Sequence, residues 1–261
     1  NFEVTDHWLQ VTDHRSQITG HRSRLQVTEL MIDPNKKEPS QVNPSEVCFR
    51  AFELINSKQF ADAEKLLSGN MSRTDDDAAI ALYHSVLGVL FKLQGEFKTA
   101  WKHYEREEKL LPKDPALKII SARLLIDQFA EYGQAIKRAK KVLELIPGNP
   151  VFAHQAYTTM GLAHVRKGER KKAVEMLEAS CGEDFRGFVS PKNIDFELVE
   201  ALLRRGWGIP SCRAFLAKAK AFADASGEKP YMNLLDRMIG SFDREFPAEP
   251  QVPQVQEENS K

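Results

Sequence analysis

Three histidines at intervals of seven residues are the first candidates for chemistry. His7, His14 and His21 end the similar stretches EVTDH, QVTDH and QITGH, and imidazole nitrogens are common metal ligands. On one helix, successive histidines would lie about 10 Å apart, too far to share an ion. Parallel chains in an oligomer could bring one histidine each into a layer. We interpret the three as polar or solvated residues and predict no metal site.

The segment that carries them, residues 1–32, also has an apolar period of seven. Its apolar positions are Val4, Val11, Ile18 and Leu25. On a helix they would form a stripe of the kind that associates with another helix. Thr, Asp and Ser are poor helix formers, however, and Val-Thr pairs favour strands. We interpret the segment as a helical self-association element, with extended and disordered alternatives left open.

No group of residues elsewhere has the spacing of a catalytic site. The sequence lacks a Gly-rich phosphate loop, a GxSxG elbow and a paired zinc motif. The carboxylates Glu105, Glu107 and Glu108 lie among lysines and arginines, which indicates a solvated helix face rather than acid–base catalysis. We therefore predict that the protein is not an enzyme and has no cofactor.

Charge and cysteine content restrict the class of protein further. The 37 basic and 37 acidic residues balance, which argues against binding that depends on neutralising phosphates. Cys48, Cys181 and Cys212 are odd in number and widely spaced, so a reduced compartment is favoured over a disulfide framework. We predict a cytoplasmic protein without a membrane span. The chain does not begin with Met, so a periplasmic location stays open.

Residues 81–115 contain a distinctive pattern of large and small side chains. Leu87-Gly88 is a large–small pair, Gly95 and Phe97 form a bend with an apolar plug, and Pro112 ends a second helix. The stretch resembles the tetratricopeptide repeat (TPR), whose period is about 34 residues. Because one such unit cannot bury its apolar faces alone, the resemblance implies stacked neighbours.

Three further copies start at Pro44, Ala116 and His154. Their small residues recur at the eighth and twentieth positions, for example Ala51 and Ala63 in the first copy. The third copy departs from the pattern, since Arg123 stands at its eighth position. We predict that the two helices of this copy cross less closely than in the other repeats.

The resemblance implies an all-α fold, a right-handed superhelical solenoid of antiparallel helix pairs. After Ser180 we expect a loop, a degenerate fifth helix pair across 193–226 and a C-terminal capping helix across 230–246. The expected organisation is the N-terminal segment 1–32, a linker 33–43 with Pro and Lys, the repeat domain 44–246 and a disordered tail 247–261.

In TPR proteins the first helices of the repeats line a concave groove that binds partners. Carried over to this chain, the resemblance places these residues in the groove: Phe52, Ile55, Leu82, Ser85, Val89, Lys92, Leu117, Ile120, Leu124, Gln155, Thr158 and Leu162. Lys92 is nearly the only cation among them, so we expect no clamp for a C-terminal carboxylate. Alternatively, some of these residues belong to the core, or the chain's own ends fill the groove.

The predicted function is that of an adaptor or scaffold which binds an apolar peptide or helix of a protein partner in this groove. Two other functions stay open. One is a regulatory or chaperone subunit of a bacterial secretion, pilus or motility machine. The other, less favoured because of the balanced charge, is a helical repeat that binds RNA.

Overall fold

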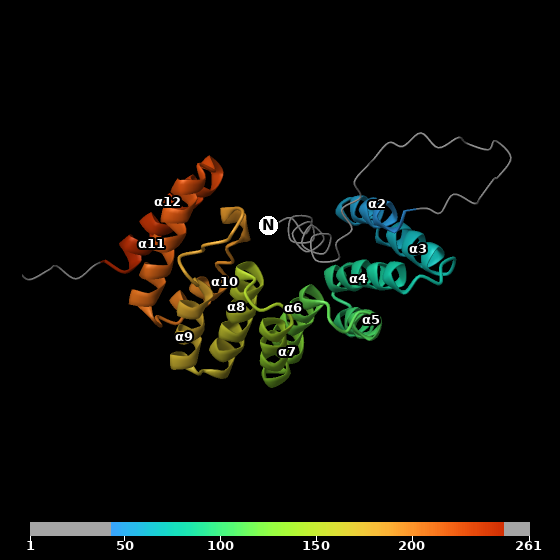
Figure 1. Ribbon diagram of the computed structural model, residues 1–261, viewed down its shortest axis with the longest axis horizontal. Helices are drawn as coiled ribbons and strands as arrows, with labels where there is room; N and C mark the ends of the chain where they lie inside the picture. Colours follow the sequence, from blue (N-terminus) through green and yellow to red (C-terminus); the bar gives the residue numbers. More distant parts are fainter. Residues whose placement is uncertain (1–42, 248–261) are drawn as a thin grey trace, which may run out of the picture.

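The computed structural model describes residues 43–247, which form an arc of helical hairpins (Figure 1). Each hairpin has a first helix, A, and a second helix, B. The pairs are α2 (Pro44–Asn56) with α3 (Phe60–Met71), α4 (Asp77–Leu93) with α5 (Phe97–Leu110), α6 (Pro115–Leu124) with α7 (Tyr132–Leu145), α8 (Pro150–Lys167) with α9 (Arg170–Ser180), and α10 (Glu197–Leu203) with α11 (Ile209–Ser226). A last helix, α12 (Lys229–Glu245), packs on α11. No strand occurs within the described range, and the predicted all-α solenoid is confirmed.

The predictions for residues 1–42 and 248–261 concern parts of the chain outside the described range. Inside it, the expected loop after Ser180 is a run of turns that ends in a short 3₁₀ helix, η2 (Pro191–Asn193). The capping helix α12 buries Leu235 and Phe242 on one side. Its opposite side exposes Asn233, Asp236 and Arg237 to solvent. The solenoid therefore ends in a polar face at its C-terminal end.

The A helices of the first four hairpins share one local start signal. An Asn or Asp side chain caps each of them by accepting a hydrogen bond from a backbone N–H of the first turn, at 3.0–3.1 Å. The four capping residues are Asn43, Asp76, Asp114 and Asn149. Such a cap contributes about 1 kcal/mol to helix stability. The B helices of the same hairpins have no side-chain cap, so packing has to fix where they begin.

Small residues lie where the helices approach most closely. A Cβ added to Gly88 would come within 2.3 Å of the Tyr104 ring, and one added to Gly161 within 2.3 Å of Leu198. Tyr104 is fully buried, and its hydroxyl has no hydrogen-bond partner in the structure. The B helices contribute alanines with no exposed surface, which are Ala63, Ala100, Ala135 and Ala173. Because these positions carry only a hydrogen atom or a methyl group, larger side chains such as Tyr104 and Leu198 can pack directly against the facing helix.

The third hairpin contains one extra residue. In the first, second and fourth hairpins, a backbone hydrogen bond closes the turn between residues five apart, as from Glu96 N–H to Phe91 O at 2.8 Å. In the third, Glu131 N–H donates to Leu125 O, six residues back, because α6 runs into a π-helical turn, η1 (Leu125–Phe129). Gly88 lies three residues before Phe91, the acceptor of this bond in the second hairpin. The residue three positions before the acceptor Leu125 is Ala122, which is fully buried.

The expectation of a looser crossing in the third hairpin assumed that Arg123 stands at the crossing, whereas the structure places Ala122 there. Ala122 shares a core cluster with Ala135 of α7 and Ala163 of α8, so the helices again meet at small residues. Arg123 is displaced by one position and leaves the crossing. A π turn of this kind often lies at a functional position.

We predict opposite effects for two glycine-to-alanine substitutions. Gly88→Ala should lower the free energy of unfolding by roughly 1–3 kcal/mol, since the new methyl group overlaps a fully buried ring. Gly69→Ala in α3 meets nothing within 4 Å, so it should raise the free energy by about 0.5–1 kcal/mol through helix propensity. Urea titration measures both. Equal effects would show that the crossing at Gly88 is not close-packed.

Candidate functional site

The A helices lie on the inner side of the arc and the B helices on its outer side (Figure 1). Five of the predicted groove residues are partly exposed there, which are Leu82, Val89, Ile120, Gln155 and Leu162. Lys92 is exposed. The apolar members of this set rest on core clusters below them. These side chains are the accessible part of the predicted surface.

The other predicted groove residues are buried. They are Phe52, Ile55, Ser85, Leu117, Leu124 and Thr158, each at most 3% exposed. Leu117 and Leu124 of α6 share a cluster with residues of α4 and α5, so they join the second hairpin to the third. The buried Thr158 hydroxyl has no hydrogen-bond partner in the structure.

The extra residue of the third hairpin changes which side chain belongs to the inner row. One position beyond the small residue lie Phe52, Val89 and Leu162 in the first, second and fourth hairpins. The corresponding residue of α6 is Arg123. The row therefore has a cation at its centre, at a point where the sequence predicted the apolar Leu124.

Arg123 links three hairpins. Its Nε donates a hydrogen bond to Thr159 Oγ1 of α8 at 2.9 Å, and its two terminal nitrogens form ion pairs with Asp195 and Glu197. The Arg123 side chain is 15% exposed and that of Asp195 is 24% exposed. Burial alone would raise the pKa of Asp195, but the Arg123 guanidinium holds this pKa below its ordinary value. The pair thus fixes the segment before α10 against α6 and α8.

A fully buried histidine continues this network. The backbone N–H of Asp195 donates to Nε2 of His154 at 2.8 Å, and Nδ1 of His154 lies 2.9 Å from Ser180 O. Because Nε2 accepts a hydrogen bond, Nδ1 must carry the proton and donate to the carbonyl, so the imidazole is neutral. Burial lowers the pKa of His154, against the opposing effect of the Asp195 carboxylate. The rings of Phe185 and Phe188 pack edge-on against it.

A second pair of histidines joins α4 to α5. Nδ1 of His84 and Nδ1 of His103 are 3.0 Å apart, and the His103 ring stacks on Phe91. One nitrogen must donate and the other accept. Burial lowers the pKa of both, that of His103 to about 4, with His84 and Arg106 adding to the effect on His103. Two neutral, mutually hydrogen-bonded rings are a packing element of this hairpin.

The three cysteines of residues 43–247 are all buried. Cys48, Cys181 and Cys212 form no disulfide with one another, and burial raises the pKa of Cys181 to about 11 and that of Cys212 to about 12. A thiol with such a pKa is a poor nucleophile at neutral pH. Within this range, no three His, Cys, Asp or Glu residues are grouped so that they could hold a metal ion. None of its helices is long and apolar enough to cross a membrane.

The fold is similar to that of several solved structures. BtubC (BKLC) from P. vanneervenii has a TM-score of 0.55 and 14% sequence identity, and the match covers 99% of this chain and 98% of that one. No protein-family model matches the sequence, and the comparison with curated proteins gave no match. The hairpins, the small residues at their crossings and this likeness agree. The chain has a TPR-like helical repeat fold.

Two other solved structures are less similar to this TPR-like chain. MamA 41-end from Desulfovibrio magneticus RS-1 has a TM-score of 0.47 and 13% identity over 72% of this chain and 99% of that one. A tetratricopeptide repeat protein from Parabacteroides merdae has a TM-score of 0.39 and 12% identity over 76% and 93%. At such identities the likeness concerns the fold alone.

The ion pairs of Arg123 were missed by sequence reasoning, although one signal was present. A large cation at the position where a TPR-like repeat needs a small residue should prompt a search for a register shift. Asp195 and Glu197 are more than 70 residues further along the chain, so no local pattern could identify them as its partners.

We predict that Arg123→Met destabilises the fold by roughly 1–3 kcal/mol, since it leaves the mostly buried Asp195 carboxylate without its cation. The matched control is Lys141→Met, which removes an ion pair whose two side chains are more than half exposed. Its effect should be below about 0.5–1 kcal/mol. Chemical denaturation gives both values. A cost for Arg123→Met no larger than that of the control would show that the Arg123 network is not structural.

His154 predicts a loss of stability in mild acid. Its pKa is lowered in the folded state, whereas an unfolded histidine titrates near pH 6.5. Below that pH, His154 binds a proton in the unfolded chain but stays neutral in the folded chain. The free energy of unfolding therefore has its full contribution from His154 above about pH 6.5 and decreases as the pH drops further. His154→Gln, which can also donate and accept, should reduce the slope of unfolding free energy between about pH 6.5 and 5 by up to 1.4 kcal/mol per unit. An unchanged slope would contradict this role for His154.

Proposed function

We propose that this protein is a protein-interaction scaffold whose partner binds the inner face of the arc. The supporting observation is the series of partly exposed apolar side chains on three consecutive A helices. Leu82 and Val89 lie on α4, Ile120 on α6 and Leu162 on α8. Apolar side chains that remain accessible side by side on a helical repeat usually belong to a binding surface.

The chemistry of the inner face indicates the type of partner. An apolar helix or extended peptide would cover Val89, Ile120 and Leu162 and remove them from water. Arg123 is already neutralised by two carboxylates of its own chain, so it is not available to bind the carboxylate of a partner. Lys92 is exposed at the edge of this face. The partner is therefore expected to bind mainly through apolar side chains.

A random peptide library panned against the immobilised chain tests the proposal. We expect enrichment of amphipathic or apolar peptides. Val89→Glu and Leu162→Glu should each weaken binding of an enriched peptide about tenfold or more, because a carboxylate would be placed against an apolar contact. Lys137→Glu on the outer helix α7 is the matched control and should leave the affinity unchanged.

Circular dichroism and the thermal midpoint establish that each variant is folded before its affinity is compared. Variants that are folded and still bind the peptides with wild-type affinity would contradict the proposal. Failure of the library to yield any enriched peptide would do so as well.

A further inference from the structure

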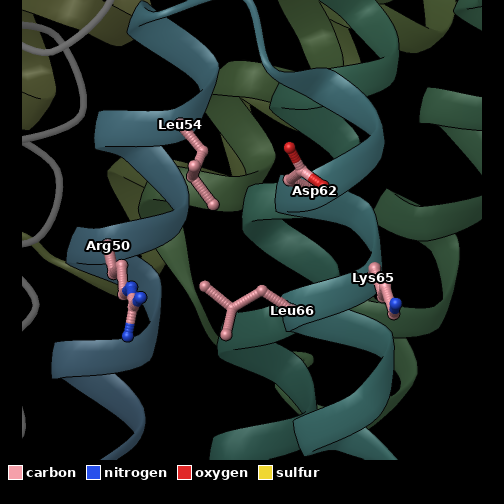
Figure 2. A pocket seen from close by; sticks show the side chains of 5 residues that line it. All are labelled: Arg50, Leu54, Asp62, Lys65 and Leu66. Atoms are coloured by element: carbon pink, nitrogen blue, oxygen red, sulfur yellow. The ribbon is translucent and has the colours of Figure 1, made fainter.

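The first hairpin has an open cleft on its surface. The cleft has a volume of about 420 Å³ and lies between α2 and α3. Figure 2 shows Leu54 and Leu66 projecting from the two helices toward the space between them, with Arg50, Asp62 and Lys65 around it. Its floor is thus apolar and its rim is charged.

In the later hairpins the corresponding positions are covered by the B helix of the preceding hairpin. The equivalents of Arg50 and Leu54 in the second hairpin are Leu87 and Phe91, which are 1% and 9% exposed. Both share a core cluster with Leu67 of α3. In the first hairpin Arg50 is exposed and Leu54 half-buried.

The third and fourth hairpins repeat the arrangement with different side chains. Arg138, the equivalent of Leu66, stacks on Trp101 of α5 at 5.1 Å and forms an ion pair with Glu108 of the same helix. In the fourth hairpin, Met160 and the partly buried Met176 share a cluster with α7. The cleft of the first hairpin is therefore the place that a preceding B helix occupies in the second, third and fourth hairpins.

We propose that the chain's own N-terminal segment, residues 1–32, covers this cleft and completes the solenoid at its N-terminal end. The segment lies outside the described residues and reaches α2 through a linker of eleven residues, 33–43. Such a linker spans at most roughly 40 Å, and the cleft begins within about two helical turns of Pro44. A segment tethered so closely has an effective concentration in the millimolar range, which favours it over a free partner.

The composition of the segment matches that of the cleft. Val4, Val11, Ile18 and Leu25 supply one apolar side chain every seven residues, which suits the floor made by Leu54 and Leu66. Asp6 and Asp13 recur with the same period and complement the two cations of the rim. The contrast with the other end of the solenoid supports the assignment, because there α12 already presents a polar face to solvent.

Hydrogen exchange of the full chain, followed by mass spectrometry, tests this contact. The double substitution Val11→Asp/Ile18→Asp in the segment should increase exchange in α2 and α3 about tenfold. Leu54→Asp in the cleft should do the same, and the combined variant should be no worse than either alone, since both remove one contact. Val189→Asp, at an 83% exposed site beyond α9, is the control and should leave α2 and α3 unchanged.

If Leu54→Asp itself melts the first hairpin, Arg50→Glu at the exposed rim replaces it in the same comparison. Additive effects of segment and cleft substitutions would overturn the proposal, as would wild-type exchange in α2 and α3 when the segment is substituted. Protection that rises with protein concentration would also overturn it, because the occupant would then come from a second copy. None of these outcomes depends on peptide binding at the inner face.

Discussion

The close approach of helices at small side chains is the constraint on which the rest of this structure depends. At Gly88 and Gly161 there is no room for even one methyl group beside the facing Tyr104 and Leu198, and fully buried alanines occupy the corresponding places on the B helices. A hairpin with such a crossing buries little by itself, so each must stack on the next. Stacking in turn places every A helix on the inner side of the arc (Figure 1) and gives the inner face its continuity.

The third hairpin keeps a small residue at the helix crossing and still places a charged side chain, Arg123, beside it. The π turn adds one residue between the crossing and the B helix, so Ala122 takes the crossing and Arg123 moves onto the inner row. A buried guanidinium is costly unless it is paired. Thr159, Asp195 and Glu197 pair it, and His154 holds the backbone of Asp195 in place. One position of an otherwise apolar row is thereby occupied by a cation that links the third hairpin to the fourth and fifth.

The two end faces of the described solenoid differ in polarity. A repeat stack always leaves an unpaired face at each end, and that face must be either polar or covered. Charged and amide side chains of α12 make the C-terminal face polar. At the other end, Leu54 and Leu66 remain at the bottom of a cleft. The inner face and this cleft are thus two separate surfaces, one made by consecutive A helices and the other by a single hairpin.

The helices and their order follow from local chemistry that is written in the amino-acid sequence. Asn and Asp caps, the prolines that follow three of them, and small residues at fixed spacing give the hairpins and their order, since each acts within one or two turns of helix. Which side chains are accessible depends instead on how the hairpins stack. Leu117 and Leu124 have the spacing of surface residues yet are 1% exposed, because the adjacent hairpin covers them. Arg123 reached the inner row through a one-residue register shift, for which the sequence held a single signal, a large cation where a small residue is needed. Its carboxylate partners lie more than 70 residues further along the chain, so no local spacing could identify them.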